Sequence, residues 1–360
     1  MPTPSQAALL AALSTVIDPE IRRPITDLNM VGPLKADDAG HVDLELCLTV
    51  AGCPLRDQLV QGAHDALAQV EGVTSVNVTT RAMSPQEREE LRTKLRGSTG
   101  QVTVPFAGPD STTRLLAIAS GKGGVGKSTI TANLALALAG GGLRVGVIDA
   151  DVYGFSLPRM MAATSEPTQV DDMILPPVVH GIKVISMGML VPPGQPVVWR
   201  GPMLHRVLQQ FLTDVYWDDL DVLLLDLPPG TGDVPLSVAQ MLPGAEIVIV
   251  TTPQPAAAEV ASRAGAMALQ TRQKIAGVIE NMSWLDQEDG TRLELFGSGG
   301  GAAVAGGLSE ALGTPVPLLG QVPIDIAVRK GGDTGDPVVL ASPESPAALA
   351  IQQIARALTA

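Results

Sequence analysis

The segment from residue 121 to residue 129 constrains the fold of this chain more than any other feature. It reads GKGGVGKST and matches the pattern G-x-x-x-x-G-K-S/T. An apolar stretch of strand character, Leu115 to Ser120, precedes it, and a helical pattern, Ser128 to Ala139, follows it. A phosphate-binding loop requires this context, because its glycines let successive main-chain N–H groups point at phosphate oxygens beside a helix N-terminus. The sequence therefore predicts a nucleotide site on an α/β fold.

The residue types in this loop indicate which groups of a nucleotide it binds. The ammonium group of Lys127 is expected to contact the β- and γ-phosphates of ATP, and the Ser128 hydroxyl is expected to bind Mg²⁺. The alternative is a glycine-rich turn with a chance Lys-Ser pair, which the flanking strand and helix disfavour. The predicted nucleotide-binding residues of the loop are Gly121, Lys122, Gly123, Gly124, Val125, Gly126, Lys127, Ser128 and Thr129.

Two apolar strands further along the chain end in carboxylates. The first leads into Asp149 and Asp151, and the second ends in Asp226. Because ligands bind at the carboxyl ends of strands in open α/β sheets, we expect these acids at the phosphate site, with Asp149 among the nucleotide-binding residues. Asp226 is the predicted Walker-B acid, which holds Mg²⁺ through its water shell, since a charge directly after a leucine run is otherwise costly. Asp151 is predicted either to orient the attacking water or to cap a helix or turn. Residues 228–232 are expected to sense the γ-phosphate.

From Arg114 onward, apolar runs of strand length alternate with helical segments. This alternation is typical of a mostly parallel sheet that is covered on both faces. The expected strands span residues 115–120, 144–149, 183–187, 221–227, 246–252, 275–280 and 317–322. The expected helices span residues 128–139, 203–217, 256–269 and 344–358. Residues 114–360 are therefore predicted to form the α/β P-loop NTPase domain.

The N-terminal part of the chain has a different pattern. Its expected elements are a helix over residues 9–17, a strand over 42–50, a helix over 55–70 and a strand over 73–80. Residues 1–82 are therefore predicted to form a small α+β domain. Residues 83–113 are first charged and then rich in Gly, Pro, Ser and Thr, which predicts a short helix followed by a linker.

Charge and composition exclude several kinds of partner. The chain has 24 Lys and Arg residues against 37 Asp and Glu residues, and its formal net charge of −13 repels nucleic acid and anionic lipid. Aromatic residues make up 2%, too few to predict stacking platforms for single-stranded nucleic acid. No apolar run approaches the roughly 20 residues that cross a bilayer, and the N-terminus has no signal-peptide pattern. We expect a cytoplasmic protein that binds neither nucleic acid nor membrane.

Lys122, the second residue of the loop, indicates a narrower group of ATPases. The chain resembles the deviant Walker-A ATPases, which include the MinD/ParA partitioning proteins, the nitrogenase iron protein and the Mrp/ApbC iron–sulfur cluster carriers. Segments similar to Mrp/ApbC motifs span residues 149–154, 199–203, 226–233, 252–254 and 280–283. The resemblance implies a homodimer in which Lys122 reaches the nucleotide of the partner chain, and an adenine contact from Asn281. With Lys127 and Asp151, Lys122 completes the expected catalytic set for slow ATP hydrolysis.

The N-terminal domain carries motifs of the same family. Residues 18–21, 27–31 and 48–54 resemble the small domain that bacterial Mrp proteins carry in front of the ATPase and that also occurs alone in iron–sulfur assembly systems. This domain separates the chain from MinD and ParA. The resemblance implies an ATP-dependent iron–sulfur cluster carrier whose partners are cluster-assembly and acceptor proteins.

The cysteines depart from the family pattern. Mrp-type carriers usually have a C-x-x-C pair shortly after the Asn-Met-Ser motif, and the pairs of two chains supply the four thiolates of a 4Fe–4S cluster. Residues 283–297 contain no cysteine here, and their acidic residues predict a solvated hairpin. Cys53 precedes Pro54 at an expected helix start, so it is a candidate cluster ligand whose thiol pKa the helix dipole would lower. The alternative is an ordinary turn residue. Cys47 is expected to be a packing residue within a strand.

These observations leave three functions open. The first is an ATP-dependent carrier of an iron–sulfur cluster. The second is a MinD/ParA-like positioning ATPase on membrane or DNA, which the expected C-terminal helix disfavours because Arg356 is its only cation. The third is an ATPase switch or scaffold in iron–sulfur metabolism that carries no cluster, which the missing cysteine pair favours.

Overall fold

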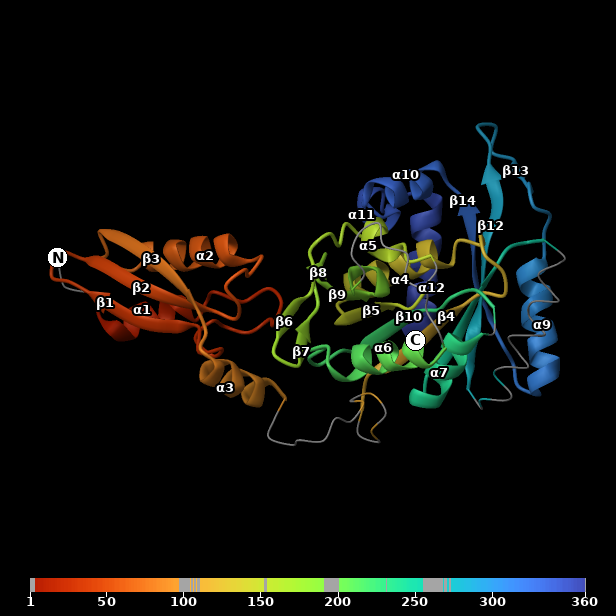
Figure 1. The fold of residues 1–360 in the computed structure, drawn as a ribbon. Helices are drawn as coiled ribbons and strands as arrows, with labels where there is room; N and C mark the ends of the chain where they lie inside the picture. The colour runs from red at the N-terminus through yellow and green to blue at the C-terminus, as the bar shows by residue number, and fades with distance from the viewer. Residues whose placement is uncertain are drawn as a thin grey trace. The chain divides into compact units, whose positions relative to one another are not determined.

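Two compact units make up the computed structural model, which describes residues 4–96, 104, 106, 108, 111–151, 154–190, 201–230, 232–254, 268, 271 and 273–359 (Figure 1). The first unit comprises Met1–Val102, Ser165–Pro176 and Asp214–Asp218. The second unit comprises Thr103–Thr164, Pro177–Thr213 and Asp219–Ala360. Two short segments that follow the P-loop in the sequence therefore belong with the N-terminal residues.

The first unit contains, in its described part, a three-stranded sheet of order β1-β2-β3. Strand β1 runs antiparallel to β2, and β3 runs parallel to β2. The alternation along β2 buries Val42, Leu44 and Leu46 in the core, as a strand with one face covered requires. The elements are α1 (Gln6–Leu13), β1 (Val31–Ala36), β2 (His41–Leu48), α2 (Arg56–Ala68), β3 (Ser75–Ala82) and α3 (Pro85–Arg96).

The first unit also includes a hairpin from the middle of the chain. Strands β6 (Thr168–Val170) and β7 (Met173–Leu175) pair antiparallel, and Ile174 forms a bridge with Val215. Four apolar residues of these segments share one buried cluster with the core of the N-terminal residues. They are Val170, Met173, Leu175 and Tyr216. The hydrophobic core of the first unit is thus completed by segments that lie far away in the sequence.

The second unit is organised around a nine-stranded sheet within the described residues. The order is β13-β12-β11-β4-β10-β5-β9-β8, with β14 also paired to β12. All pairings are parallel except those of β8 with β9 and of β13 with β12. The strands are β4 (Arg114–Ala119), β5 (Val145–Asp149), β8 (Val178–Val179), β9 (Ile182–Ser186), β10 (Val222–Asp226), β11 (Glu246–Thr251), β12 (Ile275–Asp286), β13 (Arg292–Leu293) and β14 (Leu318–Ile324).

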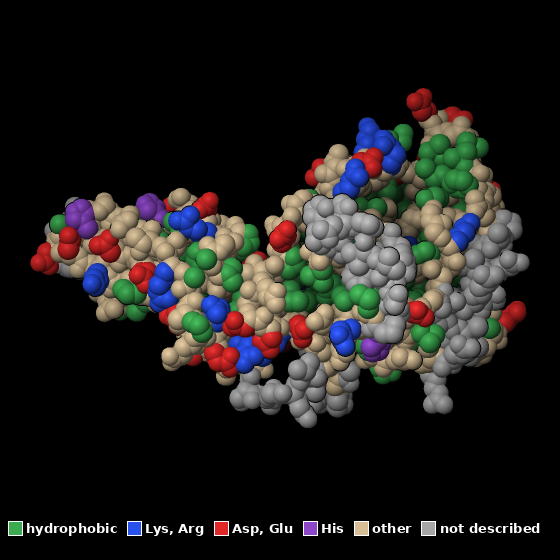
Figure 2. Space-filling model, viewed as in Figure 1, with side chains coloured by type: hydrophobic (Ala, Val, Ile, Leu, Met, Phe, Trp, Pro, Cys, Tyr) green, Lys and Arg blue, Asp and Glu red, His purple; other side chains and the backbone are tan. Residues whose placement is uncertain are grey.

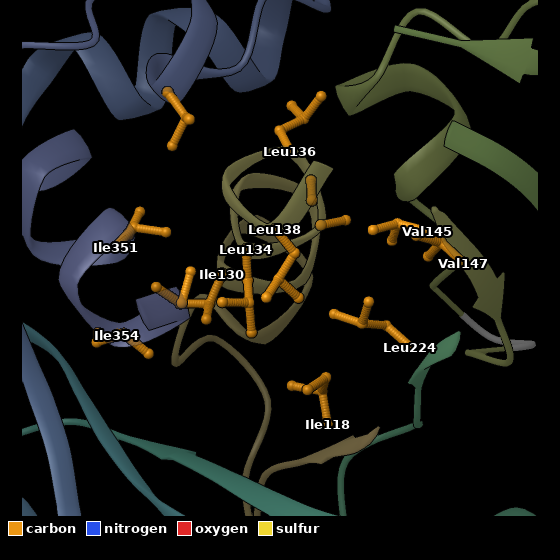
Figure 3. Close-up of a cluster of buried hydrophobic side chains, with 14 of the residues drawn as sticks. Ile118, Ile130, Leu134, Leu136, Leu138, Val145, Val147, Leu224, Ile351 and Ile354 are labelled. Carbon is orange, nitrogen blue, oxygen red and sulfur yellow. The ribbon is translucent and has the colours of Figure 1, made fainter. Parts of the chain in front are cut away.

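Helix α4 is the centre of the core of the second unit. Its buried side chains, among them Ile130, Leu134 and Leu138, meet β-strand residues on one side and Ile351 and Ile354 of α12 on another (Figure 3). The helices are α4 (Lys127–Gly140), α5 (Leu157–Met160), α6 (Gly201–Thr213), α7 (Asp233–Met241), α9 (Gly300–Leu312), α10 (Ile326–Thr334), α11 (Val338–Ala341) and α12 (Pro346–Thr359), with a 3-10 turn at Met187–Leu190. This packing fixes the helix that begins at the P-loop.

The mostly parallel sheet and the small N-terminal domain confirm the predicted fold class. The expected strands of the second unit are present, although β12 continues to Asp286 where the sequence pattern predicted an end at residue 280. The helix expected over 203–217 ends at Thr213, because the next residues pair with β7 in the first unit. The helix expected over 256–269 lies almost wholly outside the described residues.

Candidate functional site

The P-loop connects the carboxyl end of β4 to the first residue of α4. Gly124 and Gly126 have φ angles of 81° and 82°, in the left-handed region that favours glycine. A Cβ atom at Gly126 would also collide with the side-chain amide of Asn281. The pocket at this loop is lined by Ser120, Lys122, Gly123, Gly124, Val125, Gly126, Lys127, Ser128, Thr129, Asp151, Ser156, Met160 and Pro229. The loop conformation is the concave arrangement that binds phosphate.

Asp226 is the centre of a buried polar cluster beside the loop. Its Oδ2 lies 2.7 Å from Lys127 Nζ and accepts a hydrogen bond of 2.6 Å from the Ser128 hydroxyl. Its Oδ1 accepts a 2.7 Å bond from the hydroxyl of Thr131. The Lys127 side chain is 6% exposed and that of Asp226 is 0% exposed. The sequence therefore brings together the predicted phosphate-binding and magnesium-binding residues.

The donor set at this position fits Mg²⁺. Magnesium prefers hard oxygen ligands and is usually held by one or two carboxylates or hydroxyls together with substrate phosphates. Ser128 and Asp226 supply such oxygens next to the loop that would hold the phosphates. These two residues would hold the ion, whose charge would offset that of the triphosphate.

Asp149 differs from its expected role as a residue that faces the nucleotide. It is fully buried, and its oxygens accept hydrogen bonds from the backbone N–H groups of Asp151, Ser156 and Leu157 and from the Ser186 hydroxyl. Burial, together with the nearby charge of Asp226, raises the pKa of Asp149 to about 7. Asp149 therefore holds the loop that follows β5 and contributes nothing to the lining of the pocket.

Asp151 lines the pocket, as expected for a residue that orients water. It is 8% exposed, and its Oδ1 accepts a 3.1 Å hydrogen bond from the Gly154 backbone N–H. The carboxylate thus also stabilises the turn that follows β5, which is the alternative that the sequence left open. Both roles are compatible because a carboxylate has a second oxygen and several lone pairs.

Lys122 and Asn281 both contact protein groups next to the loop. Lys122 Nζ donates a hydrogen bond of 2.5 Å to Gln254 Oε1, which belongs to the Thr-Pro-Gln segment after β11. The Asn281 amide donates a 2.9 Å hydrogen bond to the carbonyl oxygen of Val125. Asn281 therefore supports the P-loop from β12, a contact that the sequence did not predict.

The contacts of two polar residues, Thr131 and Glu280, were not predicted from the sequence. Thr131 lies one helical turn after Lys127, so the four-residue spacing placed its hydroxyl on the same face of α4 and could have been used. Glu280 is 1% exposed and accepts hydrogen bonds from the Gly301 N–H at the start of α9 and from Gln321. Glu280 connects three elements that are remote in sequence, which no local pattern reveals.

The structure contradicts the expected properties of Cys53. The side chain is 9% exposed, and α2 begins at Arg56, two residues after Pro54. Burial raises the pKa of the Cys53 thiol, and the charges of Glu20 and Asp18 raise it further, whereas backbone N–H groups at the helix start lower it only in part. The predicted exposed thiolate was therefore wrong, because desolvation outweighs the helix N-terminus. Cys47 is a buried packing residue of β2, as predicted.

The segment that lacks the expected cysteines forms a hairpin of β12 and β13. Leu285 pairs with Leu293, and the Arg292 guanidinium lies 3.9 Å from the ring centre of Trp284. Glu288 and Asp289 are exposed, as predicted for a solvated acidic hairpin. Among the residues that the structure describes, no group of three or more His, Cys, Asp or Glu side chains is placed to hold a metal ion.

Comparisons with known proteins match both units. Residues 111–359 match the family described as ParA, NUBPL iron-transfer P-loop NTPase, and residues 6–79 match the family described as iron-sulfur cluster assembly protein. This chain belongs to the NUBPL iron-transfer P-loop NTPase family. The iron-sulfur cluster carrier protein of Mycobacterium tuberculosis is 57% identical over 353 residues, which cover 98% of this chain and 93% of that protein. The resemblance predicted from the motifs is confirmed.

Two solved structures each match about two thirds of this chain. A nucleotide-binding protein from Archaeoglobus fulgidus, in complex with ADP, is 34% identical with a TM-score of 0.57, and the match covers 68% of this chain and 96% of that one. The cell division ATPase MinD of Pyrococcus furiosus is 23% identical with a TM-score of 0.50, over 68% of this chain and 98% of that one. The MinD likeness shows the shared fold alone.

Proposed function

We propose that this chain is an ATP-binding and ATP-hydrolysing carrier that binds an iron–sulfur cluster and transfers it to acceptor proteins. The main support is the identity of 57% with a protein named iron-sulfur cluster carrier protein over nearly the whole chain, so that the likeness includes both units. In this proposal residues 1–82 form the assembly-type domain, residues 83–113 a linker and residues 114–360 the ATPase domain. The compact units differ from these bounds, because Ser165–Pro176, Asp214–Asp218 and the chain up to Val102 belong to the first unit. The cluster is the cargo of the protein.

The roles proposed for the ATPase residues follow from the geometry of the pocket. The P-loop amides and Lys127 would bind the phosphates, while Ser128 and Asp226 would hold Mg²⁺. Asp151 would orient the attacking water, and Lys122 would act in a homodimer across the interface. We expect slow hydrolysis that falls to background in Asp151→Asn, and a loss in Lys122→Ala that is largest where the wild-type protein is dimeric and shrinks as both proteins are diluted to monomers. Full turnover in Asp151→Asn would remove that residue from the catalytic set.

Cluster binding can be tested by reconstitution without oxygen. Purified protein is incubated with iron and sulfide, and the charge-transfer absorbance of an iron–sulfur cluster is measured together with bound iron and sulfide. We expect absorbance that Cys53→Ala removes and that the matched variant Cys47→Ala retains, since Cys47 is a packing residue of β2. Absence of absorbance in the wild-type protein under all loading conditions would refute cluster binding.

A second candidate function is an ATPase switch or scaffold that carries no cluster. Residues 283–297 have no cysteine, and both cysteines of the chain, Cys47 and Cys53, are buried. These two observations favour this candidate. It predicts full ATP turnover together with iron and sulfide contents that stay at background after reconstitution.

A positioning role on membranes has less support. The apolar residues of α12 face the core of the second unit, and Ile351, Ile354 and Leu358 are each at most 5% exposed. They are therefore not available to enter a lipid surface as an amphipathic anchor would. Among the described residues, none of the helices has the length and apolar character needed to span a bilayer. Co-sedimentation with anionic liposomes or with DNA would identify a positioning ATPase.

A further inference from the structure

The β6–β7 hairpin lies in the sequence between the nucleotide-binding segments but packs with the N-terminal residues. It is inserted after α5, and its strands belong to the first unit. Its side chains Val170, Met173 and Leu175 are each at most 1% exposed and share a cluster with Leu13 and Leu59. Burial on this scale is the main source of stability in a packed interface. The hairpin is therefore docked on the core of the first unit.

Helix α3 holds the turn of this hairpin through a row of arginines. Arg88, Arg92 and Arg96 follow at spacings of four residues, which places them on one face of the helix. Arg88 Nε lies 3.2 Å from an oxygen of Asp171, and Arg92 and Arg96 lie 2.9 Å and 3.8 Å from Asp172. Asp171 and Asp172 are the two turn residues between β6 and β7. Basic and acidic side chains are interspersed in the α3 region in Figure 2.

The first strand of the hairpin contacts the acidic group beside Cys53. The Thr168 hydroxyl donates a 3.2 Å hydrogen bond to Glu20 Oε1, and both residues are buried. Glu20 is close enough to Cys53 for its charge to raise the pKa of the thiol. The Glu20 backbone N–H donates to Asp18 Oδ1 at 3.0 Å, which holds the two acids in one turn. Cys53 itself belongs to the same buried cluster as Val170, Met173 and Leu175 of the hairpin.

The segment that leads into the hairpin lines the nucleotide pocket. Ser156 and Met160 contribute to the lining of the pocket, and Met160 is the last residue of α5. Strand β6 begins at Thr168, eight residues later in the chain. A nucleotide in the pocket would therefore contact the segment whose continuation contacts Glu20.

We propose that the β6–β7 hairpin is a cover that controls access to Cys53, and that nucleotide binding at the P-loop acts on this cover through residues 156–167. Docking of the hairpin on α3 keeps the thiol enclosed, and release of the hairpin exposes it. Any consequence for cluster loading rests on the function proposed above. The accessibility of the Cys53 thiol to a small reagent can be measured whether or not the protein carries a cluster.

The test measures the rate at which a small maleimide modifies Cys53 in the full chain. Cys47→Ala is the background, so that Cys53 is the single cysteine. Arg88→Glu with Arg92→Glu breaks the exposed ion pairs and is expected to raise the rate about tenfold, given the modest strength of each such pair. Adding Asp171→Arg and Asp172→Arg restores opposite charges and is expected to return the rate to near its starting value. Arg329→Glu, which breaks an exposed pair with Asp333, is the matched control.

A second variant tests the proposal even if the hairpin stays docked after its ion pairs with α3 are broken. It replaces residues 168–175 by a short Gly-Ser linker and removes the cover altogether. An unchanged modification rate in this variant overturns the proposal. Mg-ATP is expected to change the rate in the Cys47→Ala background and to leave it unchanged when Lys127→Ala is added. An identical rate with and without Mg-ATP in that background overturns the link to the nucleotide. Neither readout requires a cluster, so failure here is distinct from failure of the carrier function.

Discussion

The two units differ in how deeply their most prominent ion pairs are buried. In the first unit the carboxylates and arginines form ion pairs near the surface, such as Arg81 with Glu87, whose side chains are 38% and 29% exposed. In the second unit the central pair, Lys127 with Asp226, is almost completely buried. Exposed pairs contribute little to stability each. A buried pair costs much to desolvate, which is consistent with a functional role at the proposed phosphate site.

Removal of the buried ammonium group of Lys127 is expected to have the largest effect, on ATP turnover. Lys127→Ala should reduce ATP turnover at least about a hundredfold, because a preorganised charge at the transferred phosphate is lost. Lys330→Ala, an exposed lysine in α10, is the control. Phosphate release at saturating Mg-ATP measures the effect, and normal turnover in Lys127→Ala would end the ATPase assignment.

Removal of the Asp149 carboxylate, which accepts hydrogen bonds from the loop after β5, should have the second-largest effect. Asp149→Ala leaves several donors unpaired, including the backbone N–H groups of Ser156 and Leu157, and should lower the free energy of unfolding of the second unit by about 2–3 kcal/mol. Asp149→Asn keeps one acceptor oxygen and should lose less. Denaturant unfolding compares the two variants, and equal losses would contradict the assigned contacts.

Loss of the hydrogen bond from Asn281 of β12 to the P-loop is expected to have a smaller effect, on the affinity for Mg-ATP. Asn281→Ala removes the donor to the Val125 carbonyl without introducing a charge. Affinity for Mg-ATP should fall about fivefold, which corresponds to about 1 kcal/mol for one hydrogen bond. Calorimetric titration gives this value. A wild-type affinity would mean that the loop holds its conformation without β12.

Two carboxyl groups whose pKa values are shifted in opposite directions, Glu87 and Asp149, should give the two units opposite responses to pH, with the smallest effects. Pairing with Arg81 lowers the pKa of Glu87 to about 2, so its contribution to stability is present above its ordinary pKa and is lost as the pH falls through the acid range. The pKa of Asp149 is raised to about 7, so the folded second unit retains that proton and its stability decreases as the pH rises from about 4 to about 7.

Amide exchange measured separately for each unit can check these signs. Between pH 6 and pH 3 the first unit should lose protection, and Glu87→Gln should reduce that loss. Asp149→Asn should flatten the dependence of the second unit on pH. A parallel response of both units would show that these groups do not control their stabilities.

The sequence predicted those parts of the site that depend on local order. The P-loop and the acids at the ends of β5 and β10 follow from a motif and from strand direction, and the structure has them at those places. The roles of these residues stay predictions, and Asp149 is buried instead of lining the pocket. The predicted state of Cys53 was wrong, because a local argument from the helix start could not account for burial by the whole unit. The β6–β7 hairpin was not predicted, because each strand has three residues, too few to show an alternating pattern of apolar and polar side chains. The apolar residues on which it packs also lie about a hundred residues away in the sequence.

The contact between Gly126 and Asn281 has a consequence for how this protein can vary. A side chain at position 126 meets the amide of a residue that is 155 positions later in the chain, and the backbone there already disfavours anything but glycine. The residues at positions 126 and 281 are therefore coupled. In a library of random variants selected for folding, alanine at position 126 should appear only together with a side chain smaller than asparagine at position 281.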